Sequence, residues 1–89
     1  MAEKKELDFS PISGMLEQII NDRTVPKNIR AAAGQSKAVI DGTTSAELKI
    51  STAVSTLDEI INDPNMPMYT RTHIWSIVSM LEQLRRELE

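Results

Sequence analysis

The chain has 89 residues, a net charge of −3 at pH 7 and no cysteine. This length suits one small domain, and the absence of cysteine excludes disulfides, thiolate metal sites and cysteine nucleophiles. The acidic balance, with the basic residues dispersed, argues against direct binding to nucleic acid, and no apolar run approaches the roughly 20 residues that span a bilayer. We therefore expect a cytoplasmic protein that contacts neither membrane nor nucleic acid directly.

The N-terminal tail, residues 1–9, is expected to be frayed or lightly docked, because it is mostly charged and lacks apolar periodicity. A single domain is expected over residues 10–89. Ser10 followed by a proline is typical of a helix start. The apolar residues that come next recur at helical spacing and predict the first helix: Ile12, Met15, Leu16, Ile19 and Ile20.

A second helix is expected to follow closely, from about Val25 to Ile40. Thr24 would cap its start, and Pro26 would lie in its first turn, where a proline is tolerated because the amides there have no intrahelical partner. The first two helices then form a hairpin at residues 10–41.

The centre of the chain is a break between two hairpins. Gly42 is expected to end the second helix in a left-handed conformation. The sequence TSAE, which begins at Thr44, matches a capping box and starts a third helix, which ends before Pro64 because the residue preceding a proline avoids helical geometry. Asn65 would cap a fourth helix with a broad apolar face, which completes the second hairpin at residues 44–88.

The two predicted hairpins have similar sequences. The segment LEQIINDRTVP at residues 16–26 returns as LDEIINDPNMP at residues 57–67, and the same shift of 41 positions pairs Arg30 with Arg71. This repeat predicts an all-α fold in which two pseudo-symmetric helical hairpins pack into a closed four-helix bundle. The alternative is an open HEAT-like pair of helical repeats, although fewer than about three repeats rarely stabilise an open stack.

The second half of the chain, through Leu84, resembles a small archaeal family known only as uncharacterised protein family number 147 of its series. The resemblance rests on the motif II-N-D-x-x-x-P, which begins at Ile60, and on R-T-x-I-W at residues 71–75. It implies a four-helix, bromodomain-like bundle of about this length. It implies no activity, and no functional residue is carried over from it.

Two polar pairs occur at equivalent places in the repeat: Asp22 with Arg30, and Asp63 with Arg71. A carboxylate after one helix and an arginine about two turns into the next can meet across the hairpin turn, so we interpret each pair as a structural turn clasp. The alternative is an anion or substrate site that uses the two pseudo-symmetric arginines.

Trp75 takes the place that Gly34 has in the first repeat. We interpret this exchange as size complementation, in which the indole of the fourth helix fills the space left by small residues of the second. Met68 and Trp75 widen the apolar face of the fourth helix on one side and Met80 widens it on the other, so this face is a candidate core or partner interface.

No motif indicates catalysis, a cofactor or a metal, since His73 is the only histidine and no glycine-rich phosphate loop is present. Our first hypothesis is a non-catalytic interaction module that self-associates through the fourth helix or binds an unidentified protein. One alternative is an adaptor subunit of an archaeal nucleic-acid or translation complex, bound through protein contacts. The other is a minor enzyme or ligand carrier with a pocket between the hairpins, which a buried cluster of polar groups would support.

Overall fold

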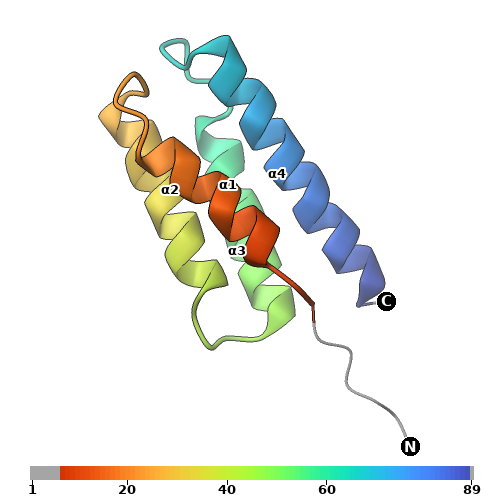
Figure 1. Cartoon of the computed structure of the whole chain (residues 1–89). Coiled ribbons are helices and arrows are strands. Elements are labelled where there is room, and N and C mark those ends of the chain that lie inside the picture. The colour runs from red at the N-terminus through yellow and green to blue at the C-terminus, as the bar shows by residue number, and fades with distance from the viewer. Residues whose placement is uncertain (1–6, 89) are drawn as a thin grey trace, which may run out of the picture.

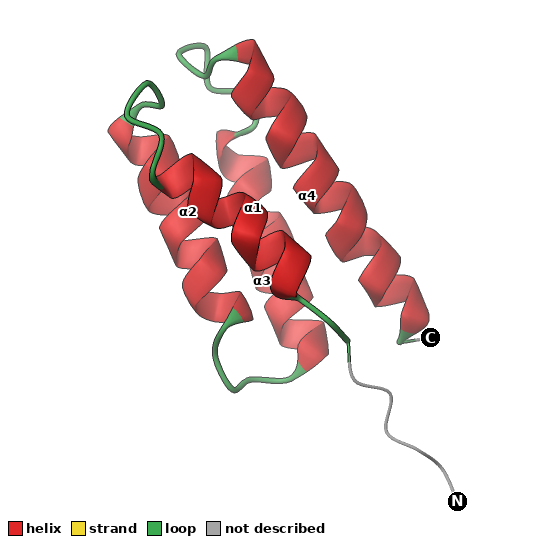
Figure 2. Ribbon diagram, in the orientation of Figure 1, coloured by secondary structure: helices red, strands yellow, loops and turns green. Residues whose placement is uncertain are grey.

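The computed structural model describes residues 7–88 and folds them into four helices. These are α1 (Ser10–Ile20), α2 (Lys27–Ile40), α3 (Ala46–Ile60) and α4 (Met68–Glu87). Consecutive helices run antiparallel (Figure 1), and the described part of the chain contains no strand (Figure 2). The predicted all-α fold is confirmed. Within the same residues, no helix combines the length and the apolar character needed to traverse a bilayer.

The four helices close into a ring. α1 packs against α2, α2 against α3, α3 against α4, and α4 returns to α1. The contact between α1 and α4 joins the two hairpins at their outer edges, and an open stack of two helix pairs would not contain it. The closed four-helix bundle is therefore confirmed and the HEAT-like alternative is wrong. The bromodomain likeness stays a prediction.

One aliphatic core fills the ring, as the small number of aromatic residues requires. Leu16 and Leu57, which are equivalent in the repeat, are both 0% exposed, and burying a leucine side chain contributes about 1.5–3 kcal/mol. All four helices and both hairpin turns supply core residues, and some of these are equivalent in the repeat, such as Ile12 with Ala53 and Val25 with Met66. The apolar members of the core are Ile12, Leu16, Ile19, Val25, Ile29, Ala33, Ile40, Ile50, Ala53, Leu57, Met66, Ile74, Ile77 and Leu81.

The tight turns inside the two hairpins are closed by aspartates. The N-caps of α2 and α4 are prolines whose side chains make no capping hydrogen bond. Ahead of them, the Thr24 amide donates to Asp22 Oδ1 at 2.9 Å, and the Asn65 amide donates to Asp63 Oδ1 at 2.8 Å. The predicted helix caps Thr24 and Asn65 are therefore wrong, because each is a donor in an Asx turn and not an acceptor for helix amides.

The connection between the hairpins differs from expectation at two residues. The Ser45 hydroxyl, and not that of Thr44, caps α3 and accepts from the Leu48 amide at 3.2 Å. Gly42 does not have a positive φ, so its predicted left-handed conformation is wrong. A Cβ at this position would lie 3.3 Å from two α2 carbonyl oxygens, so the close approach of the chain explains the glycine.

The chain ahead of α1 lies on the bundle. Leu7 and Phe9 are partly buried and pack against the core. α1 begins at Ser10 as predicted, but the Ser10 side chain is not a cap; its amide donates to the Asp8 carboxylate at 3.0 Å. The predicted tail is thus docked from residue 7 onward, and its residues 1–6 lie outside the described part of the chain.

Candidate functional site

The two arginines of the predicted clasps bind backbone carbonyls. Arg30 Nε donates to the Val25 carbonyl at 3.0 Å. Arg71 Nε donates to the Ile61 carbonyl at 2.9 Å, and its Nη2 donates to the Asp63 carbonyl at 2.9 Å. Ile61 is the C-cap of α3, where carbonyls have no intrahelical partner and attract a donor. Each arginine thus stabilises its own turn through the main chain, and it acts on the aspartate of the predicted clasp as a nearby charge that helps to lower the pKa of Asp22 or Asp63.

The two aspartates join the hairpins to each other. Tyr69 at the start of α4 donates its hydroxyl to Asp22 Oδ2 at 3.1 Å, and Asn28 at the start of α2 donates its amide to Asp63 Oδ2 at 2.8 Å. Asn28 and Tyr69 are equivalent in the repeat, as are the two aspartates. In each hairpin, the same position of the second helix therefore donates a hydrogen bond to the turn of the other hairpin.

These hydrogen bonds favour the ionised aspartates. The Thr24 hydroxyl and amide, more than any charge, hold the pKa of Asp22 below its ordinary value of 3.8. The Asn28 amide, followed by the Asn65 main-chain amide, lowers the pKa of Asp63 in the same way. Two anionic turns do not make a site for an anionic substrate, so this alternative reading of the arginines has no support here.

Trp75 and Gly34 do not meet. α2 and α4 lie diagonally across the ring, and Trp75 points outward with 53% of its surface exposed. A Cβ at Gly34 would find no atom within 4 Å. The predicted size complementation is therefore wrong, because both residues lie on the outside of their helices.

The methionines of α4 divide between interior and surface. Met80 is partly buried and packs against the core. Met68 is 66% exposed and lies two helical turns before Trp75, on the same side of α4. Thr72 and Ser79, about one turn to either side of Trp75, are exposed as well. Together Met68, Thr72, Trp75 and Ser79 form what we call the α4 outer face.

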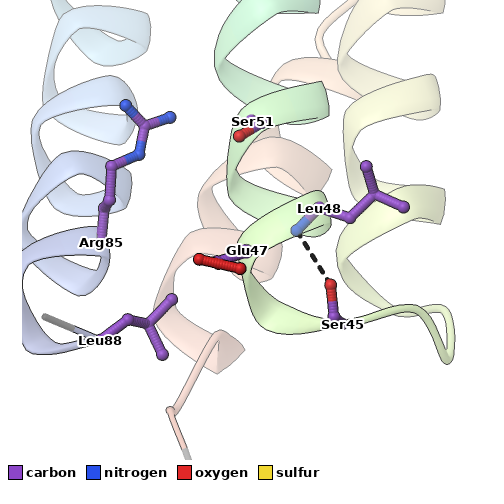
Figure 3. A pocket seen from close by; sticks show the side chains of 6 residues that line it. All are labelled: Ser45, Glu47, Leu48, Ser51, Arg85 and Leu88. Atoms are coloured by element: carbon purple, nitrogen blue, oxygen red, sulfur yellow. Dashed lines mark hydrogen bonds between the residues drawn. The ribbon is translucent and has the colours of Figure 1, made fainter.

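A hollow of about 520 Å³ lies where the start of α3 faces the end of α4. In Figure 3, Arg85 and Leu88 point across the gap toward Ser51 and Glu47, whereas Leu48 points to the other side of α3. Arg85 Nη1 is paired with Glu82 of its own helix at 3.2 Å. The hollow is wide and mostly lined by exposed residues, so it offers a shallow surface and no enclosed reaction centre.

Sequence reasoning overlooked Asn28, Tyr69 and Thr70. Asn28 and Tyr69 could have been found, because they are equivalent in the repeat and each is a polar residue at the start of the second helix of its hairpin. Thr70 is different: it is 1% exposed, and its hydroxyl has no hydrogen-bond partner. No sequence pattern indicates this, because its neighbours Ile74 and Ile77 make Thr70 resemble an ordinary member of a helical stripe.

Comparison with known proteins places the chain among archaeal relatives. A UPF0147 protein of Methanocaldococcus jannaschii is 57% identical over 72 residues, 80% of this chain and 77% of that protein. One from Pyrococcus abyssi is 37% identical over 86 residues, covering 96% of this chain and 100% of that protein. None of these relatives has a functional name.

Solved structures show the same fold. A crystal structure from the uncharacterised family UPF0147 of Thermoplasma acidophilum matches with a TM-score of 0.82 and 42% identity, over 85% of this chain and 91% of that one. A second, of the unknown-function protein MMP1188, has a TM-score of 0.80 and 46% identity, over 89% and 96% of the two chains. The family model for UPF0147 matches residues 1–84. The chain therefore belongs to the uncharacterised protein family UPF0147, as its resemblance to that family implied.

Proposed function

We propose that this chain is a non-catalytic protein-interaction module that forms a homodimer through the α4 outer face. The observation that carries the proposal is the position of Trp75. It is the chain's only tryptophan, and the bundle leaves 53% of it exposed. Tryptophan and methionine are enriched in the buried centres of protein interfaces, and tryptophan is among the residues whose truncation costs most binding energy.

The surroundings of Trp75 suit a second helix. The small side chains of Thr72 and Ser79 flank the indole, so another backbone can come close to it, and Met68 extends the apolar strip. α4 has 20 residues and is therefore about 30 Å long. This length is compatible with the roughly 500 Å² per partner that a small specific interface needs. A second copy is the simplest occupant, because one self-complementary patch is enough for a two-fold dimer.

The non-catalytic part of the proposal is supported by chemistry. The chain has one histidine, the residue most often used as general acid or base, and no cysteine to act as a thiol nucleophile. The carboxylates with lowered pKa values are occupied in turn and helix contacts: Asp8, Asp22, Asp41 and Asp63. A cytoplasmic location stays a prediction.

Sedimentation velocity at tens of micromolar tests the dimer. Wild-type protein should sediment as a dimer and Trp75→Ala as a monomer with unchanged far-UV circular dichroism, because the indole is outside the core. Leu48→Ala is the matched control, since Leu48 is also 53% exposed but lies on α3. It should remain dimeric. A monomeric wild type, or equal loss of the dimer in both variants, would refute the proposal.

A further inference from the structure

A second, smaller cavity lies between α1 and α4, beside the first hairpin turn. Its volume is about 220 Å³, roughly that of seven water molecules, so it suits a ligand of about six or seven non-hydrogen atoms. Ile19 and Val25 form an apolar wall, and both are almost fully buried. The polar side is formed by Gln18 of α1, by Asp22 and by three residues of α4: Tyr69, Thr70 and His73.

The repeat shows that the fold does not require this polar side. At the equivalent positions around the other turn, Tyr69 is replaced by Asn28, Thr70 by Ile29, and His73 by Ala32. Val25 is replaced by the larger Met66, which is 5% exposed and belongs to the core. Gln18 and Asp22 have polar counterparts, Glu59 and Asp63, so the difference lies on the second helix of each hairpin: all three positions are polar on α4, and two of the three are apolar on α2.

Thr70 is the costliest of these differences. Its buried hydroxyl has no hydrogen-bond partner, whereas the equivalent Ile29 is fully buried without any polar atom to satisfy. Ser36 also has a buried hydroxyl without a partner, but it lies on α2 and does not line the cavity. Thr70 therefore combines an unpaired hydroxyl with a position in the cavity wall, and Ser36 does not.

The charge of the lining selects the ligand. Asp22 is its only acid, and no lysine or arginine is among the residues that line it. The pKa of Asp22 is lowered mainly by Thr24, with Arg30 contributing least, so the carboxylate is ionised at neutral pH. The Tyr69 hydroxyl donates to Asp22 Oδ2 at 3.1 Å and holds the carboxylate at the cavity.

We propose that this cavity binds a small organic cation, a primary ammonium ion with a short alkyl chain. The ammonium group donates hydrogen bonds to the Asp22 carboxylate and to the hydroxyls of Tyr69 and Thr70, and the alkyl chain lies against Ile19 and Val25. A charge-assisted hydrogen bond to a carboxylate is about twice as strong as one between neutral groups, which gives the ammonium head its advantage. The proposal is independent of self-association, because the α4 outer face does not line this cavity.

Three probes with the same alkyl chain test the charge: n-pentylammonium, n-pentanol and n-pentanoate. Titrated into the full-length protein and followed by amide chemical shifts, pentylammonium should move the signals of Tyr69, Thr70 and His73. It should bind about tenfold more tightly than pentanol. Pentanoate should bind most weakly. Equal affinity of the three probes, or shifts confined to other residues, would overturn the proposal.

Two substitutions locate the site. Asp22→Asn should weaken pentylammonium binding about tenfold, because it removes the charge while keeping an oxygen for the Thr24 amide. Asp63→Asn is the matched control at the equivalent turn and should leave the affinity unchanged. Thr70→Ile, which copies Ile29, should fill the cavity and abolish binding in a folded protein. Equal effects of the two aspartate variants, or retained binding in folded Thr70→Ile, would place the ligand elsewhere.

Discussion

Gly34 provides the sharpest test of how the helices are arranged. It lies inside α2, is partly exposed, and a Cβ built on it meets no atom within 4 Å. A glycine inside a helix costs about 0.5–1 kcal/mol relative to alanine, because its backbone loses more freedom on folding. Gly34→Ala should therefore raise the free energy of unfolding by about 0.5–1 kcal/mol, which corresponds to an increase in Tm of about 2–8 °C for a domain of this size.

Urea unfolding followed by far-UV circular dichroism measures this change, at low protein concentration so that association does not add to stability. Gly14→Ala should behave in the same way, because a Cβ there also meets no atom within 4 Å. Gly42→Ala is the opposite control, since its Cβ would lie 3.3 Å from two carbonyl oxygens and strain the chain. Destabilisation by Gly34→Ala would refute the diagonal placement of α2 and α4, because it would mean that the outer side of α2 is packed.

The polar contacts give three further predictions. Thr70→Val should raise the free energy of unfolding of the ligand-free protein by about 1 kcal/mol, because it removes a buried hydroxyl without a partner; a loss in denaturant melts would contradict this. Arg71→Met should lower it by about 1–3 kcal/mol, because two turn carbonyls lose their donor, and an unchanged melt would disprove that role. Acid should destabilise the fold: the folded-state pKa values of Asp22 and Asp63 lie below 3.8, so their contribution is present above that pH and is lost as the pH falls through the lowered values. The free energy of unfolding is measured against pH for the wild type and for a variant with both residues changed to Asn. If the variant loses as much stability in acid as the wild type, these two aspartates do not cause the loss.

Periodicity and the repeat were enough to predict the fold. The stripe from Ile12 to Ile20 and its counterpart in the second hairpin fix two helices, and the short turns force neighbouring helices to run antiparallel. With only two repeats, the apolar sides of the first and last helices are buried only if these helices pack against each other. The contact of α1 with α4 is therefore expected from the small number of repeats.

Side-chain partners could not be predicted with the same success. Sequence distance placed Asp22 near Arg30, but an arginine can donate either to a carboxylate or to a main-chain carbonyl. Arg30 donates to the carbonyl of Val25 in the turn, which no sequence pattern indicates. The breadth of the apolar face of α4 was visible in sequence. The sequence does not show which edge of that face is exposed to solvent, because a rotation of α4 by less than half a turn decides whether Trp75 or Met80 points to the core.

The repeat separates what the bundle needs from what it does not. Both hairpins keep the aspartate turn, the proline start and the buried leucines, so these features belong to folding. The differences concentrate on α4, where Trp75 replaces a glycine on the outer side and Thr70 replaces a buried isoleucine. Neither change improves packing, because one leaves an indole exposed and the other leaves a hydroxyl unpaired. Since α2 shows that the same position in the bundle can be built without them, Trp75 and Thr70 are the residues at which the proposed dimer and the proposed ligand site are each tested.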